Sequence, residues 1–354
     1  MKVLAVNSSA RSEGESKTAL MLGHLVAGMR EAGADVDVVN LREKTVKHCI
    51  GCYSCWTKTP GVCALKDGMT TELFPKWLAA DLVVYATPLF HYTVNATMKA
   101  FIERTLPYVR PFFEQREGRT VHPRRQDPPR AVVLSVAGFP EKTVFDQLSS
   151  YVNFLYGHGL LAEIYRPAAE SLGHPMARET QDDIFDATRE AGKQLVTSGR
   201  VSEETQTRIT QPIGDPEVFR RIGNAMWKTC IAEGMTPREL RQKGIIPRPD
   251  SIRSFMDLMR IGFNPQKAED TQGTLQFVFS GTEEGSCYLA IDHGTIQAVE
   301  GTAEKPDLTV EAPFEVWMDI VTRKADGQKM FMDQKYRAVG DLSLLMKMGQ
   351  LFGK

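Results

Sequence analysis

The sequence predicts an α/β protein with a doubly wound, parallel, five-stranded sheet, followed by a second and smaller α+β domain. Over the first 200 residues, short apolar runs alternate with segments whose apolar residues recur at helical spacing. Strands that alternate with helices in this way form parallel sheets with crossover helices. After Gly273 apolar and polar residues alternate one by one, which indicates hairpins. The two patterns therefore predict two domains.

The first domain is expected to contain five strands and four helices. The strands are expected at 2–6, 35–41, 82–86, 131–136 and 160–165, and the helices at 17–32, 94–109, 141–156 and 181–196. Segment 82–86 (LVVYA) is continuously apolar, as in a strand buried on both faces, whereas 35–41 alternates and fits a sheet edge. The ligand site of such a sheet lies at the carboxyl ends of its strands.

The second half of the chain begins after a polar segment. Residues 199–215 end in Pro and Gly and predict a linker, and the helical pattern over 216–262 is interrupted at 244–249. Further helices are expected at 312–323, 326–333 and 341–352. We therefore place the first domain at 1–200, a linker and helical connector at 201–264, and the second domain at 265–354.

Composition excludes several classes of function. The 354 residues carry a formal net charge of -1, which gives no electrostatic reason to expect nucleic acid as a partner. No apolar run approaches the roughly 20 residues that span a bilayer, so no transmembrane segment is expected. The apolar start of the chain is too short for a signal peptide. We therefore expect a cytoplasmic protein.

The turn after the first strand combines hydroxyl groups with positive charge. The hydroxyls come from Ser8, Ser9, Ser16 and Thr18 and the charge from Arg11 and Lys17, between a buried strand and a helix. Backbone N–H groups and the positive end of the helix dipole bind phosphate at such a turn. The turn lacks the glycine pattern of dinucleotide folds, so it suits the terminal phosphate of FMN better than a pyrophosphate. The alternative is that the hydroxyls merely cap the helix.

Three loops resemble those of the NADPH-dependent FMN reductase family. The first follows the pattern N-G-S-P-R, with Ser8 in place of Gly and Ala10 in place of Pro. The second follows T-P-x-Y/F and a helix that ends K-x-F-x-D/E-R, here from Lys99 to Arg104, and the third is 135–141. The resemblance implies a flavodoxin-like fold, bound FMN, NAD(P)H as the electron donor and a homo-oligomer. It places these residues near the flavin ring: Thr87, Pro88, Leu89, Phe90, His91, Tyr92, Ser135 and Gly138.

A flavin carries its own redox chemistry. Because the ring accepts the hydride, no side chain is expected to act as a catalytic acid or base.

Four of the six cysteines lie within fifteen residues. Cys49, Cys52, Cys55 and Cys63 have the spacing C-x2-C-x2-C-x7-C, which indicates a metal or redox site in a cytoplasmic chain. The spacing resembles that of the iron–sulfur flavoproteins, and 66–69 resembles their K-D-D-M segment. The resemblance implies a [4Fe–4S] cluster. A redox-active or structural loop and a zinc site are the alternatives.

The end of the chain resembles the sterol-carrier-protein family. The tail 329–352 follows A-F-x-x-G-K-L-K-I-x-G-D and an apolar helix that ends L-F, with Asp333 and Gln334 where the family has a small residue and Gly. The resemblance implies an apolar ligand in a tunnel, and a filled core without a tunnel is the alternative.

Two hypotheses of function follow. The first is an FMN-dependent NAD(P)H oxidoreductase that passes electrons to a small-molecule acceptor, for which a lipophilic molecule such as a quinone is one candidate. The second is a lipid-binding or sterol-binding carrier whose flavodoxin-like domain senses redox state without turnover.

Overall fold

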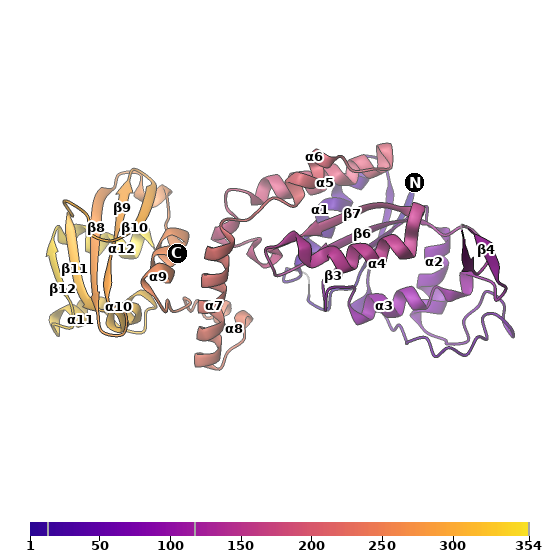
Figure 1. Ribbon diagram of the computed structural model, residues 1–354, viewed down its shortest axis with the longest axis horizontal. Coiled ribbons are helices and arrows are strands. Elements are labelled where there is room, and N and C mark those ends of the chain that lie inside the picture. The colour runs from indigo at the N-terminus through magenta and orange to yellow at the C-terminus, as the bar shows by residue number, and fades with distance from the viewer. Residues whose placement is uncertain (13, 117, 353–354) are drawn as a thin grey trace. The chain divides into compact units, whose positions relative to one another are not determined.

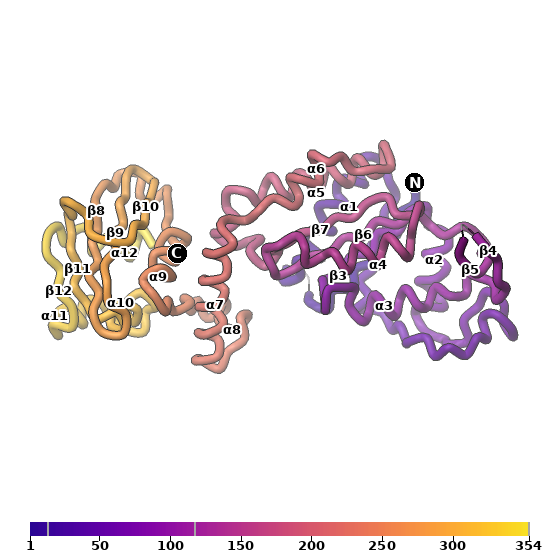
Figure 2. The backbone as a smooth tube through the Cα atoms, viewed as in Figure 1, coloured from indigo at the N-terminus to yellow at the C-terminus, as the bar shows by residue number. Residues whose placement is uncertain are grey.

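The computed structural model describes residues 1–12, 14–116 and 118–352, and it divides the chain into two compact units, 1–213 and 214–354. Figures 1 and 2 show both units coloured by residue number. Within the described ranges, no helix is long and apolar enough to cross a membrane. The two units are described separately below.

The first unit is built on a parallel sheet in the order β2-β1-β3-β6-β7. Its strands are β1 (Lys2–Asn7), β2 (Asp35–Asn40), β3 (Leu82–Pro88), β6 (Arg130–Val136) and β7 (Leu160–Arg166). Counted along the chain, this is the order 2-1-3-4-5 of flavodoxin-like sheets. The predicted fold class is confirmed, and β2 lies at the edge as its alternating pattern predicts.

Helices cover both faces of this sheet. They are α1 (Lys17–Glu31), α2 (Phe74–Ala79), α3 (Ala96–Glu103), α4 (Asp146–Tyr156), α5 (Gln181–Ser198) and α6 (Glu203–Ile209). The residues of α2, α3 and α4 share one apolar core with the sheet, while α1 and α5 pack on each other at the opposite face (Figure 1). Helix α3 is shorter than the expected 94–109, because Pro107 cannot continue the helix and 106–108 form a 3-10 turn.

Helices α1 and α5 cross at two glycines. A Cβ at Gly28 would lie 1.8 Å from the carbonyl oxygen of Arg189, and one at Gly192 would lie 2.1 Å from that of Leu25. Only a hydrogen in place of each side chain allows the two backbones to approach this closely.

Three features of the first unit differ from the sequence-based expectation or were absent from it. The segment 199–215, expected as a linker, contains α6, which Ser202 caps and which contacts β7. The strands β4 (Glu114–Arg116) and β5 (Arg119–Val121) form a separate hairpin. A π-helical turn over Met69–Leu73 precedes α2.

A buried arginine closes the end of the first unit. Arg166, the last residue of β7, is 1% exposed and donates to the carbonyls of Ile209 at 2.6 Å and Gln211 at 2.8 Å. Burial lowers the pKa of Arg166 to about 10. The side chain therefore ties the last turn of α6 to the sheet.

The second unit contains a five-stranded sheet in the order β10-β9-β8-β11-β12. The strands are β8 (Gln272–Ser280), β9 (Gly285–Asp292), β10 (Thr295–Glu300), β11 (Leu308–Pro313) and β12 (Arg337–Gly340). The helices are α7 (Pro216–Glu233), α8 (Pro237–Gln242), α9 (Ile252–Gly262), α10 (Phe314–Val321), α11 (Gly327–Met332) and α12 (Leu342–Leu351). All pairs are antiparallel except β8 with β11.

The core of this unit is rich in aromatic side chains. Trp317 lies 5.4 Å from Phe277 and 5.3 Å from Tyr336 between ring centroids. Gln334, which stands where the sterol-carrier-protein pattern has Gly, adopts the left-handed conformation with φ 55. The turn that a glycine would make is therefore formed by another residue at a conformational cost.

Candidate functional site

The polar loops of the first unit meet at the carboxyl ends of β1 and β3. The strand order reverses between these two strands, and ligands of open α/β sheets bind in the crevice at that point. Ser8 ties the two strand ends together, because both its N–H, at 2.9 Å, and its hydroxyl, at 3.2 Å, donate to the carbonyl of Ala86.

The turn after β1 buries its hydroxyl groups at the start of α1. Ser9, Ser16 and Thr18 are all buried. Ser16 is the N-cap, since its hydroxyl accepts from the N–H of Ala19 at 3.0 Å, and the Ser9 hydroxyl accepts from the N–H of Arg11 at 3.3 Å. Capping therefore occupies one of these hydroxyls, while the helix start directs its positive potential into the turn.

Both cations of this turn bind the segment that follows β7. Arg11 Nη1 lies 2.5 Å from Glu170 Oε1, and both side chains are about half exposed. Lys17 Nζ donates to the carbonyl of Leu172 at 2.5 Å. The segment 170–172 thus lies beside the turn after β1, which the sequence did not indicate.

The second loop presents aromatic rings at its surface. Phe90 is 56% exposed and Tyr92 is 52% exposed, and His91 and Tyr92 both adopt left-handed backbone conformations, with φ 47 and 64. Non-glycine residues in this region are uncommon and cluster at ligand sites. The N–H of Leu89 donates to the carbonyl of Val136 at 2.9 Å, so the second and third loops are joined.

The third loop contains a buried hydroxyl without a partner. Within the described ranges, Ser135 Oγ is fully buried and makes no hydrogen bond. A Cβ at Gly138 would meet Glu170 Cγ at 4.0 Å, an ordinary contact, so the protein itself does not require glycine there. The orphaned hydroxyl marks the end of β6 as a place where a ligand atom would improve the hydrogen bonding.

Asn95 joins the first two loops and was missed by the sequence analysis. Its side-chain amide donates to the carbonyl of Ser8 at 2.7 Å, and its Oδ1 accepts from the N–H of Met98 at 3.0 Å. Its own N–H donates to the hydroxyl of Thr87 at 3.2 Å. The available signal was an Asn placed directly before a helical pattern, which is typical of an N-cap.

The four clustered cysteines line one hollow. They differ in exposure, since Cys52 is exposed, Cys49 and Cys63 are partly buried and Cys55 is buried. Burial raises the pKa of the Cys55 thiol, and the negative charges of the other three cysteines raise it further. In the part of the chain that the structure describes, no three His, Cys, Asp or Glu side chains are arranged to hold a metal ion. The thiols therefore face a common space without meeting at one point.

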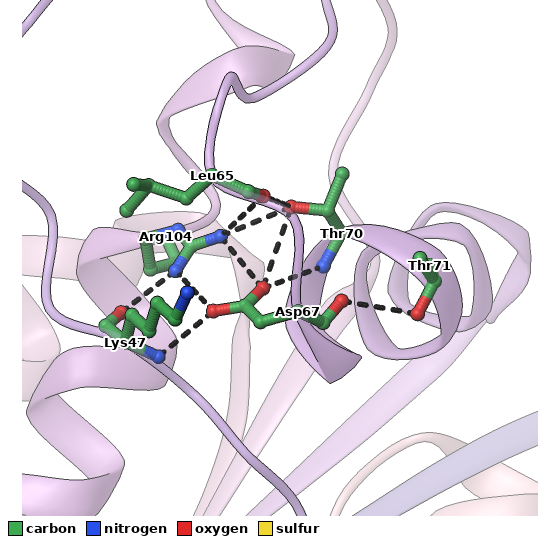
Figure 3. Close-up of polar contacts among 6 residues, drawn as sticks. All are labelled: Lys47, Leu65, Asp67, Thr70, Thr71 and Arg104. Atoms are coloured by element: carbon green, nitrogen blue, oxygen red, sulfur yellow. Dashed lines mark hydrogen bonds and ion pairs between the residues drawn. The ribbon is translucent and has the colours of Figure 1, made fainter.

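A buried ion pair links the end of α3 to the segment that follows the four cysteines (Figure 3). Arg104, the C-cap of α3, lies 2.8 Å and 2.9 Å from the two carboxylate oxygens of Asp67, and each side chain is 1% exposed. Burial alone would raise the pKa of Asp67, but hydrogen bonds from Arg104, Lys47 and Thr70 outweigh it and lower the pKa to about 2. The two sequence motifs 66–69 and 99–104 thus meet at this pair.

The fold and this site define a two-unit protein whose first unit is flavodoxin-like and has a turn lined by buried hydroxyls where the strand order reverses. Residues 1–121 match the NADPH-dependent FMN reductase family, and residues 260–353 match the SCP-2 sterol transfer family. Over these ranges, the two family resemblances that the motifs indicate are confirmed.

Known proteins are similar to parts of the chain. An iron-sulfur flavoprotein of Archaeoglobus fulgidus is 30% identical over 154 residues, which cover 43% of this chain and 61% of that protein. An iron-sulfur flavoprotein of Methanocaldococcus jannaschii is 30% identical over 107 residues, which cover 30% of this chain and 53% of that protein. The chain thus spans about half to three fifths of the length of these relatives. The solved structure of an FMN-dependent NADH-azoreductase from Bacillus anthracis in complex with FMN shares 17% identity at a TM-score of 0.43, over 55% of this chain and 99% of that one.

Proposed function

We propose that the protein is an FMN-dependent oxidoreductase that takes electrons from NADH or NADPH and passes them to a small-molecule acceptor. The observation that carries this proposal is the turn between β1 and α1, where buried hydroxyls lie at the start of the helix and at the carboxyl end of the strand. A helix start of this kind favours a phosphate, and a flavodoxin-like sheet binds FMN at this point. The family match over 1–121 supports the same cofactor.

In this proposal the first turn holds the phosphate and the other two loops hold the ring. The phosphate ligands are Ser9, Arg11, Ser16, Lys17 and Thr18, together with backbone N–H groups of the turn. The ring lies against Thr87, Pro88, Leu89, Phe90, His91, Tyr92, Ser135 and Gly138. Bound FMN supplies hydride acceptance and one-electron or two-electron release, so the protein has to bind, orient and shield the ring.

We further propose that Cys49, Cys52, Cys55 and Cys63 hold a [4Fe–4S] cluster. Four sulfur donors on one loop line one hollow, which is the donor set that such a cluster requires. The names of both relatives support this assignment. A cluster bound there would supply one-electron transfer. Measuring iron and sulfide per chain distinguishes the cluster from a zinc ion and from a metal-free loop.

For the second unit we propose an apolar ligand. A groove beside β8, β11, β12 and α11 is lined by apolar side chains together with polar and charged ones, which include Glu311, Lys335 and Arg337. The apolar lining includes Phe279, Ala312, Phe331, Met332 and Tyr336. The match of 260–353 to the sterol transfer family supports this assignment.

The homo-oligomer and the cytoplasmic location stay predictions.

The test uses the full chain purified without oxygen. We expect bound FMN in the absorption spectrum and steady oxidation of NADH or NADPH when a quinone is added as acceptor. Protein that is colourless and takes up no FMN at micromolar concentration contradicts the proposal. Protein that holds FMN and becomes reduced without turnover supports instead a lipid carrier with a redox-sensing domain.

A further inference from the structure

One donor of the buried Arg104 side chain is left without a partner. Nη1 donates to the carbonyl of Lys47 at 2.7 Å and to Asp67 at 2.8 Å. Nη2 donates to Asp67 at 2.9 Å, to the hydroxyl of Thr70 at 3.0 Å and to the carbonyl of Leu65 at 3.4 Å. Among the described residues Nε is buried and has no hydrogen-bond partner. An unsatisfied buried N–H is costly and calls for an explanation.

The cysteine hollow supplies that explanation. Arg104 lines the same hollow as the four cysteines, and Cys63 attracts its guanidinium electrostatically. The two terminal nitrogens of Arg104 donate to Asp67, to the hydroxyl of Thr70 and to backbone carbonyls. The guanidinium is therefore a buried positive charge that borders the thiols.

Helix α3 holds this charge at a fixed separation from the phosphate turn. Asn95 at the start of the helix binds the carbonyl of Ser8, and Arg104 ends the same helix. Eight helical residues span about 12 Å. The cysteine hollow and the turn after β1 are thus anchored to opposite ends of one short helix.

We propose that Arg104 is a positioning residue of the cysteine centre, whose buried charge raises the reduction potential of an iron–sulfur cluster held by the four cysteines. This inference rests on the proposed cluster. A cluster gains negative charge when it is reduced, so a nearby positive charge favours the reduced state. Asp67 locks the guanidinium in place and at the same time offsets part of its charge.

The two partners of the ion pair therefore have opposite effects on the potential. Arg104→Gln removes the positive charge and leaves the Asp67 carboxylate, so it makes the cluster harder to reduce. Asp67→Asn leaves the Arg104 charge uncompensated, so it makes the cluster easier to reduce. We expect each variant to change the ratio of reduced to oxidised cluster at fixed potential on the order of tenfold, which is about 59 mV for one electron. A pair that merely holds the loop would shift both variants in the same direction.

The experiment is a redox titration of the anaerobically purified full chain, followed by the absorption and the electron paramagnetic resonance of the cluster. Iron, sulfide and FMN per chain are measured for every variant. Lys99→Gln is the matched control, because Lys99 lies on the same helix but is 49% exposed and paired with Glu103. It is expected to leave the potential unchanged.

A second comparison avoids leaving Asp67 buried and unpaired. Asp67→Asn and the double variant Arg104→Gln/Asp67→Asn both lack the carboxylate and differ only in the Arg104 charge, so the double variant should have the lower potential. Equal potentials in these two variants overturn the inference, as does loss of iron from both. Wild-type protein that holds FMN but no iron also overturns it and leaves the flavin proposal standing. If the variants show the expected reduction potentials but the protein does not turn over NAD(P)H, the oxidoreductase proposal is contradicted and the inference about Arg104 stands.

Discussion

Helices α1 and α5 meet so closely that a single methyl group is expected to destabilise the first unit. In Gly28→Ala the new Cβ would lie 1.8 Å from the carbonyl oxygen of Arg189 and 2.7 Å from its carbon, where ordinary contacts begin at 3.4 Å. Both neighbours are backbone atoms, so the helices must separate by about 1.6 Å, the difference between 3.4 and 1.8 Å. Overpacking of this kind costs about 3 kcal/mol. For a unit of 213 residues, this lowers Tm by about 6–12 °C.

Gly23 provides a matched control on the same helix. A Cβ at Gly23 would meet nothing within 4 Å, so Gly23→Ala adds helix propensity without a clash and should stabilise by up to about 1 kcal/mol. Urea unfolding of the full chain, read by the release of flavin and by calorimetry, measures both variants. Our account of the helix crossing is wrong if Gly28→Ala unfolds within about 0.5 kcal/mol of wild type, or if both alanines destabilise alike.

Three further predictions concern the site. The pKa of Asp67 in the folded protein is about 2, below its ordinary value of 3.8. The carboxylate therefore contributes about 2 kcal/mol to the free energy of unfolding above pH 4, and this contribution is lost as the pH falls towards 2. Asp67→Asn should therefore destabilise at pH 7 and have a smaller effect at pH 3 in urea unfolding, and an equal loss at both pH values contradicts this. Arg11→Ala should weaken FMN binding about tenfold or more by titration, while Glu170→Gln, which frees Arg11, should not weaken it. Asn95→Ala removes the N-cap of α3 and the hydrogen bond to the carbonyl of Ser8. It should lower the free energy of unfolding by about 2 kcal/mol and weaken FMN binding. Unchanged FMN affinity would show that Asn95 does not shape the FMN site.

The five strands of the parallel sheet could be predicted because each is a short run in which apolar residues are either continuous or alternate with polar ones. Segment 82–86 forms the first five residues of β3, and the alternation over 35–41 was enough to place β2 at the edge. The residue types of the three loops likewise indicated which strand ends carry polar groups. Local patterns of this kind depend only on neighbouring residues, so one sequence is sufficient to read them.

The features that were missed depend on residues far apart in the chain. Gly28 and Arg189 are 161 positions apart, and nothing around either residue indicates that they touch. The same holds for Arg104 and Asp67, which lie on two motifs that were treated as separate. The polar sequence of α6 predicts a linker, because the helix buries little more than Thr205 and Ile209. Its stability comes from the sheet and the helix against which it packs, rather than from its own composition.

The hydrogen bonds from Arg166 to the end of α6 and the segment after it determine where the chain can be cut to obtain the first unit alone. A fragment that stops at residue 200 would remove the carbonyls of Ile209 and Gln211 and leave the Arg166 guanidinium with the Pro167 carbonyl from this set of acceptors. A fragment that continues to residue 213 keeps every one of these bonds. Thirteen residues that look dispensable are therefore expected to decide whether the flavodoxin-like half expresses as a folded protein.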